Sequence, residues 1–233
     1  MKGKIMIELA DMMLEEIGPA LPDEIATPWK ALRNRASEIL LRMEPRRTFP
    51  DGSRGYKATS QTTIEVVVGT RHDAPDAPRE RFEFPETEFE ILVHDPVFSM
   101  SGTIRLDLEI KNYRTETISK VLFPGQTVAL GVGTSFNADL KPSIGRLEIP
   151  LGIEFGPESV RSQQFIHLAV ETPMGVLHNP DAAHMRANVN QVPPVGSVYS
   201  QSGLVPMANT QGEIVAIKTL TETKIVKLLP LTE

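Results

Sequence analysis

The sequence has no cysteine among its 233 residues and a single tryptophan. The lack of cysteine excludes disulfide bonds, thiolate metal ligands and a cysteine nucleophile, while it leaves the redox compartment undetermined. Long apolar runs are missing as well, because acidic residues from Glu8 to Glu16 interrupt the apolar residues near the start. Neither a signal peptide nor a membrane span fits this pattern, so we expect a cytoplasmic protein with no membrane partner.

Clusters of positive charge are also lacking, since the formal net charge is -6 and no stripe of lysine or arginine occurs. A surface that neutralises phosphates needs such a stripe, so a nucleic acid is excluded as a partner. Much of the negative charge lies between His72 and Asp95, where acidic residues outnumber Arg79 and Arg81. We interpret this acidic cluster as the solvated face of strands.

What the sequence does contain is a helical pattern at its beginning. Apolar residues recur at helical spacing from Ile5 to Ile17 and again from Trp29 to Met43. We therefore predict an N-terminal helical hairpin over residues 1–45, followed by a polar linker over residues 46–59. The hairpin either covers one end of a sheet or joins two copies into a homo-oligomer through Ile5 to Met43.

After Pro50 the apolar period changes from that of a helix to that of a strand. Between Gly102 and Asn112, isoleucine and leucine alternate strictly with charged residues. Such alternation places the apolar side chains on one face, as in an antiparallel strand with one dry side. Similar strands recur without helices between them, so residues 60–233 are predicted to form an antiparallel β domain, either a sandwich or a barrel. The expected fold class is all-β with an N-terminal helical pair.

Three irregularities interrupt the predicted strands. The apolar positions change parity across Pro85, which predicts a bulge or a break there. Pro150 lies inside an apolar run, and because proline cannot donate to a ladder, that strand is expected to lie at an edge or to bulge. Near the end of the chain, polar residues Thr221 to Thr223 predict a hairpin turn between two strands.

Residues 172–212 break the strand rhythm with several prolines and glycines, and we predict a long irregular excursion there. The segment is too apolar for a disordered tail. We therefore expect residues 172–207 to close an apolar cavity of roughly 300 Å³ or more in the β domain.

Candidate site residues lie mainly in this excursion. Asn179 and Pro180 are explained by the start of a short helix, whereas the two flanking histidines are not. These histidines lack the spacing of a helical zinc motif, so acid–base work is the preferred role and no metal is expected. The candidate catalytic residues are His178, His184 and Tyr199, and the candidate substrate-binding residues are Arg186, Met174, Met185, Met207, His94 and Asp95.

Two classes of function fit the sequence. The first is a cofactor-independent protein that binds an apolar small molecule, with isomerase or cyclase chemistry as its enzymatic form, because every common cofactor motif is missing. The second is a non-enzymatic structural or interaction protein that assembles through its N-terminal helices or an exposed sheet edge. An enclosed apolar cavity would favour the first class.

Overall fold

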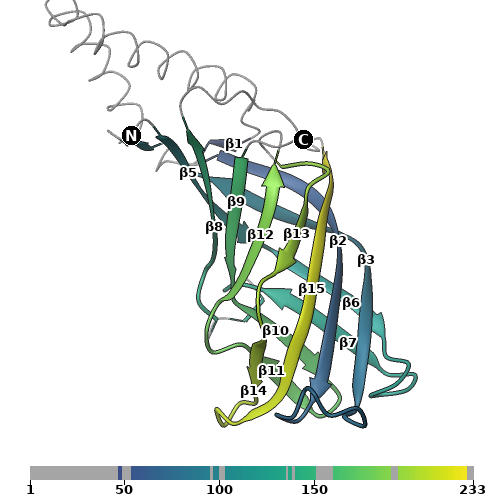
Figure 1. Ribbon diagram of the computed structural model, residues 1–233. Helices are drawn as coiled ribbons and strands as arrows, with labels where there is room; N and C mark the ends of the chain where they lie inside the picture. The colour runs from purple at the N-terminus through teal and green to yellow at the C-terminus, as the bar shows by residue number, and fades with distance from the viewer. Residues whose placement is uncertain are drawn as a thin grey trace, which may run out of the picture.

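Residues 47–48, 54–94, 97–99, 103–134, 136–137, 140–150, 160–189 and 194–229 are described by a computed structural model. They form strands joined by turns and contain no helix. The strands close into an antiparallel barrel, which decides between the two expected all-β architectures (Figure 1). The predicted helical hairpin of residues 1–45, and with it the predicted oligomer surface, lies outside the described residues.

The strand bounds define the elements used below. They are β1 (Arg47–Thr48), β2 (Arg54–Val68), β3 (Arg79–Val93), β4 (Val97–Ser99), β5 (Thr103–Lys111), β6 (Tyr113–Ile118), β7 (Thr127–Val132), β8 (Ser143–Pro150), β9 (Val160–Ile166), β10 (Leu168–Thr172), β11 (Gly175–His178), β12 (Ala183–Val189), β13 (Val198–Gln201), β14 (Val205–Ala208) and β15 (Ile214–Leu229). No segment of the described chain forms a helix long and apolar enough to cross a membrane.

The barrel consists of two halves that share the long strands β2, β3 and β15. In the upper half of Figure 1, the ring runs β2-β3-β5-β8-β9-β12-β13-β15 and closes through the pairing of β15 with β2. In the lower half, the order from β15 is β14-β11-β10-β7-β6. Between β5 and β14, strands that follow each other in pairs (β5–β6, β7–β8, β9–β10, β11–β12 and β13–β14) therefore contribute one strand to the upper half and one to the lower half.

The lower half closes differently from the upper half. Strand β6 lies beside β3 (Figure 1), yet the described residues of these two strands show no ladder pairing. Side chains join them instead, since the Thr87 hydroxyl donates to the Thr115 hydroxyl at 2.7 Å. At the lower end the Glu80 carboxylate accepts from the Ser119 hydroxyl and from the backbone N–H groups of Lys120 and Leu122. These hydrogen bonds fasten the β6–β7 turn to the end of β3.

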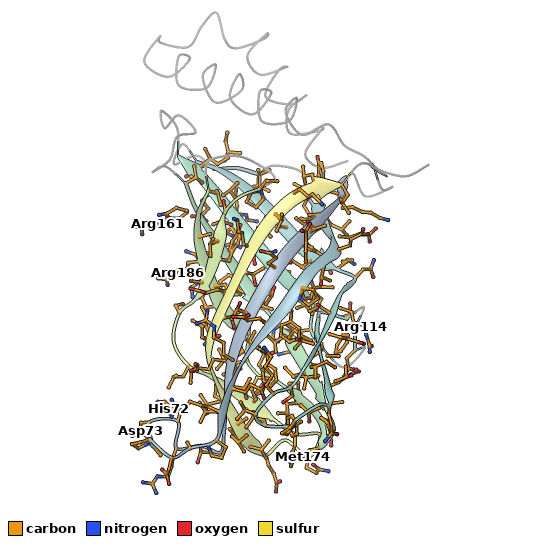
Figure 2. The ribbon with its side chains drawn as sticks, turned by 90° about the vertical axis from the view of Figure 1, so that its right-hand side faces the viewer. His72, Asp73, Arg114, Arg161, Met174 and Arg186 are labelled. Carbon is orange, nitrogen blue, oxygen red and sulfur yellow. The ribbon has the colours of Figure 1, made fainter. Side chains whose placement is uncertain are left out.

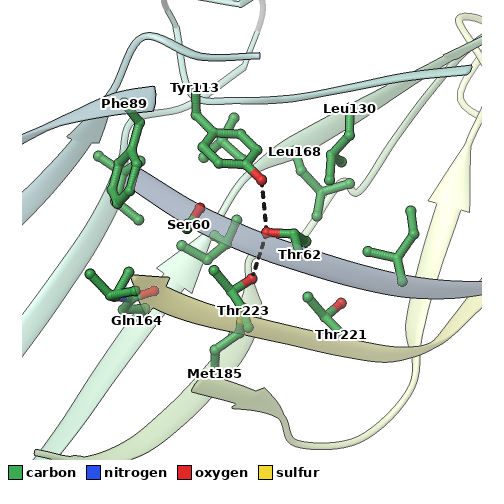
Figure 3. Close-up of a pocket in the computed structure, with 15 residues that line it drawn as sticks. Ser60, Thr62, Phe89, Tyr113, Leu130, Gln164, Leu168, Met185, Thr221 and Thr223 are labelled. Carbon is green, nitrogen blue, oxygen red and sulfur yellow. Dashed lines mark hydrogen bonds between the residues drawn. The ribbon is translucent and has the colours of Figure 1, made fainter. Parts of the chain in front are cut away.

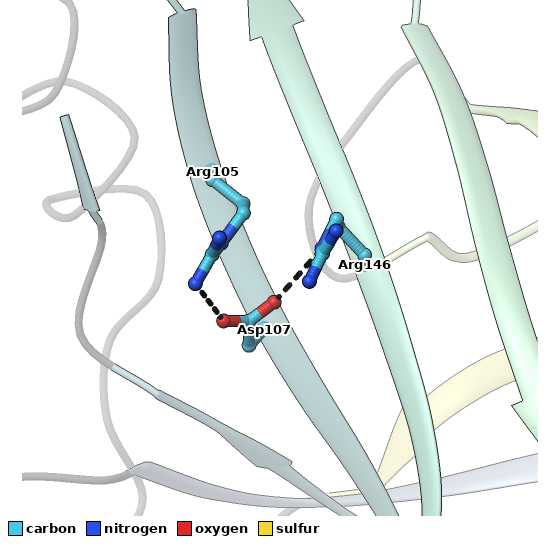
Figure 4. Close-up of polar contacts among 3 residues, drawn as sticks. All are labelled: Arg105, Asp107 and Arg146. Carbon is cyan, nitrogen blue, oxygen red and sulfur yellow. Dashed lines mark hydrogen bonds and ion pairs between the residues drawn. The ribbon is translucent and has the colours of Figure 1, made fainter. Parts of the chain in front are cut away.

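The alternation that predicted the β domain is confirmed in β5. Its even-numbered aliphatic side chains from Ile104 to Leu108 are buried in the barrel core, and the charged ones face outward. Outside, Asp107 accepts from Arg105 at 2.9 Å and from Arg146 of β8 at 3.3 Å (Figure 4). Asn112, with a φ of 56°, then reverses the parity, so that Tyr113 begins β6 with its ring inside. Asparagine tolerates this left-handed conformation better than most residues.

The predicted irregularity at Pro85 is a bulge. Strand β3 is continuous, but Ser60 pairs with Thr87 while Thr62 pairs with Phe84, so two residues of β3 oppose one of β2. The extra residue explains why the buried phenylalanines change from even to odd positions along β3.

Four other sequence-based expectations need correction. Strand β8 is not an edge strand: it lies between β5 and β9, and Pro150 is its last residue, where β9 no longer pairs. Residues 54–59 belong to β2 rather than to a linker. The described residues between 172 and 212 form β11 to β14, because each of these short strands has pairing partners on both sides. Thr221 to Thr223 are not a turn, since β15 continues through them in register with β2.

Candidate functional site

A cavity of about 40 Å³ lies in the barrel interior where the two halves meet (Figure 3). Its apolar lining includes Ile64, Phe89, Leu130, Leu168, Met185 and Ile225. Its polar lining is Ser60, Thr62, Tyr113, Gln164, Thr221 and Thr223. The cavity is several-fold smaller than the range of about 300–1,000 Å³ typical of drug-sized ligands, and thus smaller than expected.

The hydroxyl groups of the cavity come mainly from two adjacent strands. Thr62 of β2 pairs with Thr223 of β15, while Ser60 pairs with Ile225 and Thr221 pairs with Ile64. Residues opposite each other face the same side, so Ser60, Thr62, Thr221 and Thr223 all face the barrel interior. We call these four residues the hydroxyl strip. The Tyr113 phenol reaches the strip from β6 and donates to Thr62 Oγ1 at 2.7 Å (Figure 3). Burial raises the pKa of Tyr113, with the Thr62 hydrogen bond acting against the shift, so the phenol stays a donor.

Not every hydroxyl hydrogen of the strip has an acceptor in the described structure. Thr62 Oγ1 lies 3.1 Å from Thr223 Oγ1, and this bond uses the hydrogen of only one of the two threonines. Ser60 is fully buried, and although its hydroxyl influences the pKa of Tyr113, it makes no hydrogen bond of acceptable geometry in the described structure. A buried hydroxyl without a partner costs roughly 1–3 kcal/mol, which a ligand with an acceptor atom would recover.

A second polar group lies beside the cavity. Lys218 of β15 is fully buried, and its Nζ donates to the Thr221 hydroxyl, which in turn donates to Gln201 Oε1 at 2.8 Å. Gln201 Nε2 donates back to the backbone carbonyl of Lys218 at 3.1 Å. Burial lowers the pKa of Lys218 to about 7. Thr221 lines the cavity, so it connects the lysine to the interior space.

Sequence analysis missed both the hydroxyl strip and Lys218. The one available signal is a lysine inside the otherwise mostly apolar run from Ile214 to Leu220, at a position whose parity points inward. Bulges in β15, between Lys218 and Leu220 and between Ile225 and Lys227, shift this parity and hide the signal.

Of the predicted site residues, Met185 is the one that lines the cavity. Met207 is fully buried in the core of β14. Tyr199 is also fully buried, and its phenol donates to the Ser162 hydroxyl at 2.8 Å. Burial, against hydrogen bonds from Ser162 and Gln164, raises the pKa of Tyr199 to about 12, so this phenol is a structural donor at neutral pH.

The structure brings His184 and Arg186 together on the outer face of β12. The imidazole stacks on Phe165 of β9 with ring centroids 4.9 Å apart, and its Nε2 is buried without a partner. Burial of the ring, and next the charge of Arg186, lower the pKa of His184. Figure 2 shows Arg186 and Met174 at the periphery, and Met174 is 85% exposed in the turn after β10. None of these three side chains reaches the cavity.

The remaining predicted residues lie elsewhere. His178 ends β11, and His94 follows β3 with its backbone N–H donating to the Asp107 carbonyl at 2.9 Å. Asp95 lies outside the described residues. Asn179 does not begin a helix: its side chain accepts from Leu168 N and donates to the carbonyls of Ile166 and Asp181. Its amide thus satisfies the backbone groups left open between β9 and β10.

Metal binding finds no support in the part of the chain that the structure describes. No three side chains of histidine, aspartate or glutamate come together there in a way that could hold an ion. The polar groups at the cavity are hydroxyls, an amide and, behind them, an amine, all of which are able to form hydrogen bonds.

Comparisons with known proteins agree with the barrel. No protein-family model and no curated protein matches the sequence. Among solved structures, DynF from the dynemicin biosynthesis pathway of Micromonospora chersina has a similar fold, with a TM-score of 0.60 and 11% sequence identity. The similarity covers 76% of this chain and 82% of the DynF chain. At 11% identity, this similarity shows a shared fold and nothing more specific.

Proposed function

We propose that this barrel binds a small, largely apolar molecule that carries one hydrogen-bond acceptor, in the cavity beside the hydroxyl strip. The observation that carries the proposal is the fully buried Ser60 hydroxyl, which lines the cavity and has no partner in the described structure. The free hydrogen of the Thr62–Thr223 pair gives a second donor on the same wall. Two donors and an apolar surround fit an ether or carbonyl oxygen on a hydrocarbon skeleton.

The volume of the cavity sets the size of the ligand. Because the cavity has a volume of about 40 Å³, a ligand as large as a six-membered ring fits only if a side chain moves. Met185 is suited to this movement, since methionine is unbranched and has three rotatable bonds. The barrel of DynF, a protein from a biosynthesis pathway, supports the general proposal of a small-molecule-binding barrel.

Cofactor-independent isomerase or cyclase chemistry is the enzymatic form of this proposal. Donors that converge on an oxygen in a water-poor interior stabilise negative charge that develops there. In this form, Ser60 and the Thr62–Thr223 pair polarise the substrate. They replace the acid–base role that we predicted for His178 or His184, because those side chains do not line the cavity.

Binding of tetrahydropyran and cyclohexane, which differ by one ether oxygen, tests the proposal. In NMR titrations of the full chain, we expect Ser60→Ala to weaken tetrahydropyran binding by about five- to tenfold, as for one lost hydrogen bond, and to change cyclohexane binding by less than about twofold. Ser162→Ala is the matched control, because Ser162 is an equally buried interior serine that bonds Tyr199 instead. Absence of saturable binding, or equal weakening of both compounds, would contradict the proposal.

A further inference from the structure

Lys218 is the one buried cation among the described residues, and it lacks the partner that such a group normally has. Lysine is almost never fully buried unless it is paired with an acid. Lys218 is 0% exposed, and no described carboxylate lies within ion-pair distance of its amine. The amine donates a hydrogen bond to the Thr221 hydroxyl, and its other N–H groups have no acceptor among the described residues.

The residues around Lys218 provide no carboxylate that could pair with its amine. On β2 it pairs with Val66, and on β14 with Val205, both apolar. Val66 in turn pairs with Glu80 of β3, the carboxylate nearest to Lys218 along this row of the barrel. Although desolvation acts against the shift, hydrogen bonds from Lys120 N, Ser119 and Leu122 N lower the pKa of Glu80 and occupy its oxygens. Glu80 therefore already serves the β6–β7 turn.

The amine has a short path into the cavity. Lys218 and Thr221 occupy neighbouring inward positions of β15, separated by a bulge, and Thr221 lines the cavity. Breaking one hydrogen bond frees a flexible four-carbon side chain to move past the threonine. Desolvated lysines of this kind serve as amine nucleophiles toward carbonyl compounds.

We propose that Lys218 forms an imine with a small aldehyde or ketone that enters the cavity. The nitrogen lone pair forms a bond to the carbonyl carbon as the C=O π bond breaks, and a proton moves from nitrogen to oxygen to give a carbinolamine. Loss of the hydroxyl with a second proton from nitrogen releases water and leaves the C=N bond. The inference uses the same cavity as the proposed function, but it needs a different atom of the protein and a different class of ligand.

Reductive trapping tests this reactivity on the full chain. The protein is incubated with propanal and sodium cyanoborohydride at pH 7, and propylation of each lysine is read by peptide mass spectrometry. Lys224 and Lys227 are internal controls, because they belong to the same strand and are exposed. Free lysine amines are almost fully protonated at this pH, so we expect initial labelling of Lys218 to exceed that of either control by about tenfold.

Two variants and one competitor sharpen the test. Lys218→Met should abolish the label on this peptide and leave Lys224 unchanged, whereas Thr221→Val should keep or increase labelling because it removes the amine's hydrogen bond. Labelling of Lys218 equal to or below that of Lys224 would overturn the inference. Tetrahydropyran, which cannot form an imine, separates the two proposals: if it binds while Lys218 stays unlabelled, only the imine is wrong. If Lys218 is labelled without ether binding, the proposed acceptor site fails and the imine stands.

Discussion

The hydroxyl strip and the segment from Met174 to Met207 both carry polar side chains, but the strip directs them into the barrel, whereas the candidate site residues His184 and Arg186 of the segment lie on the outer face. In β2 and β15, serine and threonine hydroxyls point inward and line a cavity. In β12, His184 and Arg186 point outward, while Met185 between them points inward. The comparison shows that residue chemistry alone does not locate a site. The face on which each side chain lies decides it.

The two regions also differ in how they hold polar atoms. On the outer face, water can satisfy exposed polar atoms, although Nε2 of His184 is buried there without a partner. Inside, each polar atom needs a protein partner or a ligand. Tyr199, Tyr113 and Gln201 have such partners. The Ser60 hydroxyl has no hydrogen-bond partner, and the Lys218 amine has Thr221 but no carboxylate. We therefore place function at the interior groups that the fold leaves unsatisfied.

The largest expected effect is on stability, at Lys218. Lys218→Met should raise the free energy of unfolding by about 2–4 kcal/mol at pH 7, because the folded lysine has a pKa of about 7 and the unfolded one about 10.5. The unfolded state of the natural protein thus binds more protons than the folded state between these values. Its stability should rise with pH, and the advantage of the variant should shrink by about 2 kcal/mol between pH 7 and pH 9.

Urea unfolding at several pH values measures this effect. The chosen window lies below the raised pKa values of Tyr113 and Tyr199 and above the lowered pKa of Glu80, so these groups do not titrate within it. If the free energies of unfolding of the natural protein and the variant differ by a constant amount across the window, burial does not neutralise Lys218. Water would then reach the amine in the folded protein.

The next effect separates two methionines of the same segment. Met185→Ala removes a cavity-lining side chain that is 2% exposed, and should cost about 2–3 kcal/mol of unfolding free energy while the enlarged cavity binds cyclohexane more tightly. Met174→Ala, at 85% exposure, should change stability by less than about 0.5 kcal/mol and leave binding unchanged. Thermal unfolding and NMR titration report the two quantities. Equal effects at both positions would mean that the segment does not divide into inner and outer faces.

The same division explains what the sequence could predict. Strict alternation in β5 and the parity change at Pro85 correctly indicated an antiparallel β domain and a bulge, because one wet and one dry face leave a period of two. Thr221 and Thr223 suggested a turn because threonine is polar, yet they belong to a strand that runs beside a cavity. An interior hydroxyl looks the same in sequence as an exposed one.

Long-range pairing was the other missing information. Residues 172–212 contain enough proline and glycine to suggest an excursion, and their strands are short. Each of these strands is stabilised by a neighbour that is more distant in sequence, such as β9 beside β12 and β11 beside β14. Such tertiary pairing overrides local propensity, and a single sequence does not contain it in readable form.

A smaller effect compares the two buried tyrosines. Tyr113→Phe and Tyr199→Phe each remove one hydrogen bond to a hydroxyl and should each cost about 1 kcal/mol of unfolding free energy. Only Tyr113 lines the cavity, where its phenol polarises the Thr62–Thr223 pair. Tetrahydropyran binding, followed by NMR titration, should therefore weaken about threefold in Tyr113→Phe and stay unchanged in Tyr199→Phe. Equal binding in both variants would exclude the phenol from the acceptor site.

The smallest effects are expected on the outer face. His184→Phe keeps a ring stacked on Phe165 and removes a buried nitrogen without a partner, and Arg186→Ala removes an exposed charge. His184→Phe should raise the free energy of unfolding by at most about 1 kcal/mol, and Arg186→Ala should change it by less than about 0.5 kcal/mol. Each should change tetrahydropyran affinity by less than about twofold. A large loss of tetrahydropyran binding in either variant would contradict a ligand site in the barrel interior. It would place the ligand on the outer surface of β12, because neither side chain can reach the hydroxyl strip without crossing the wall of the barrel.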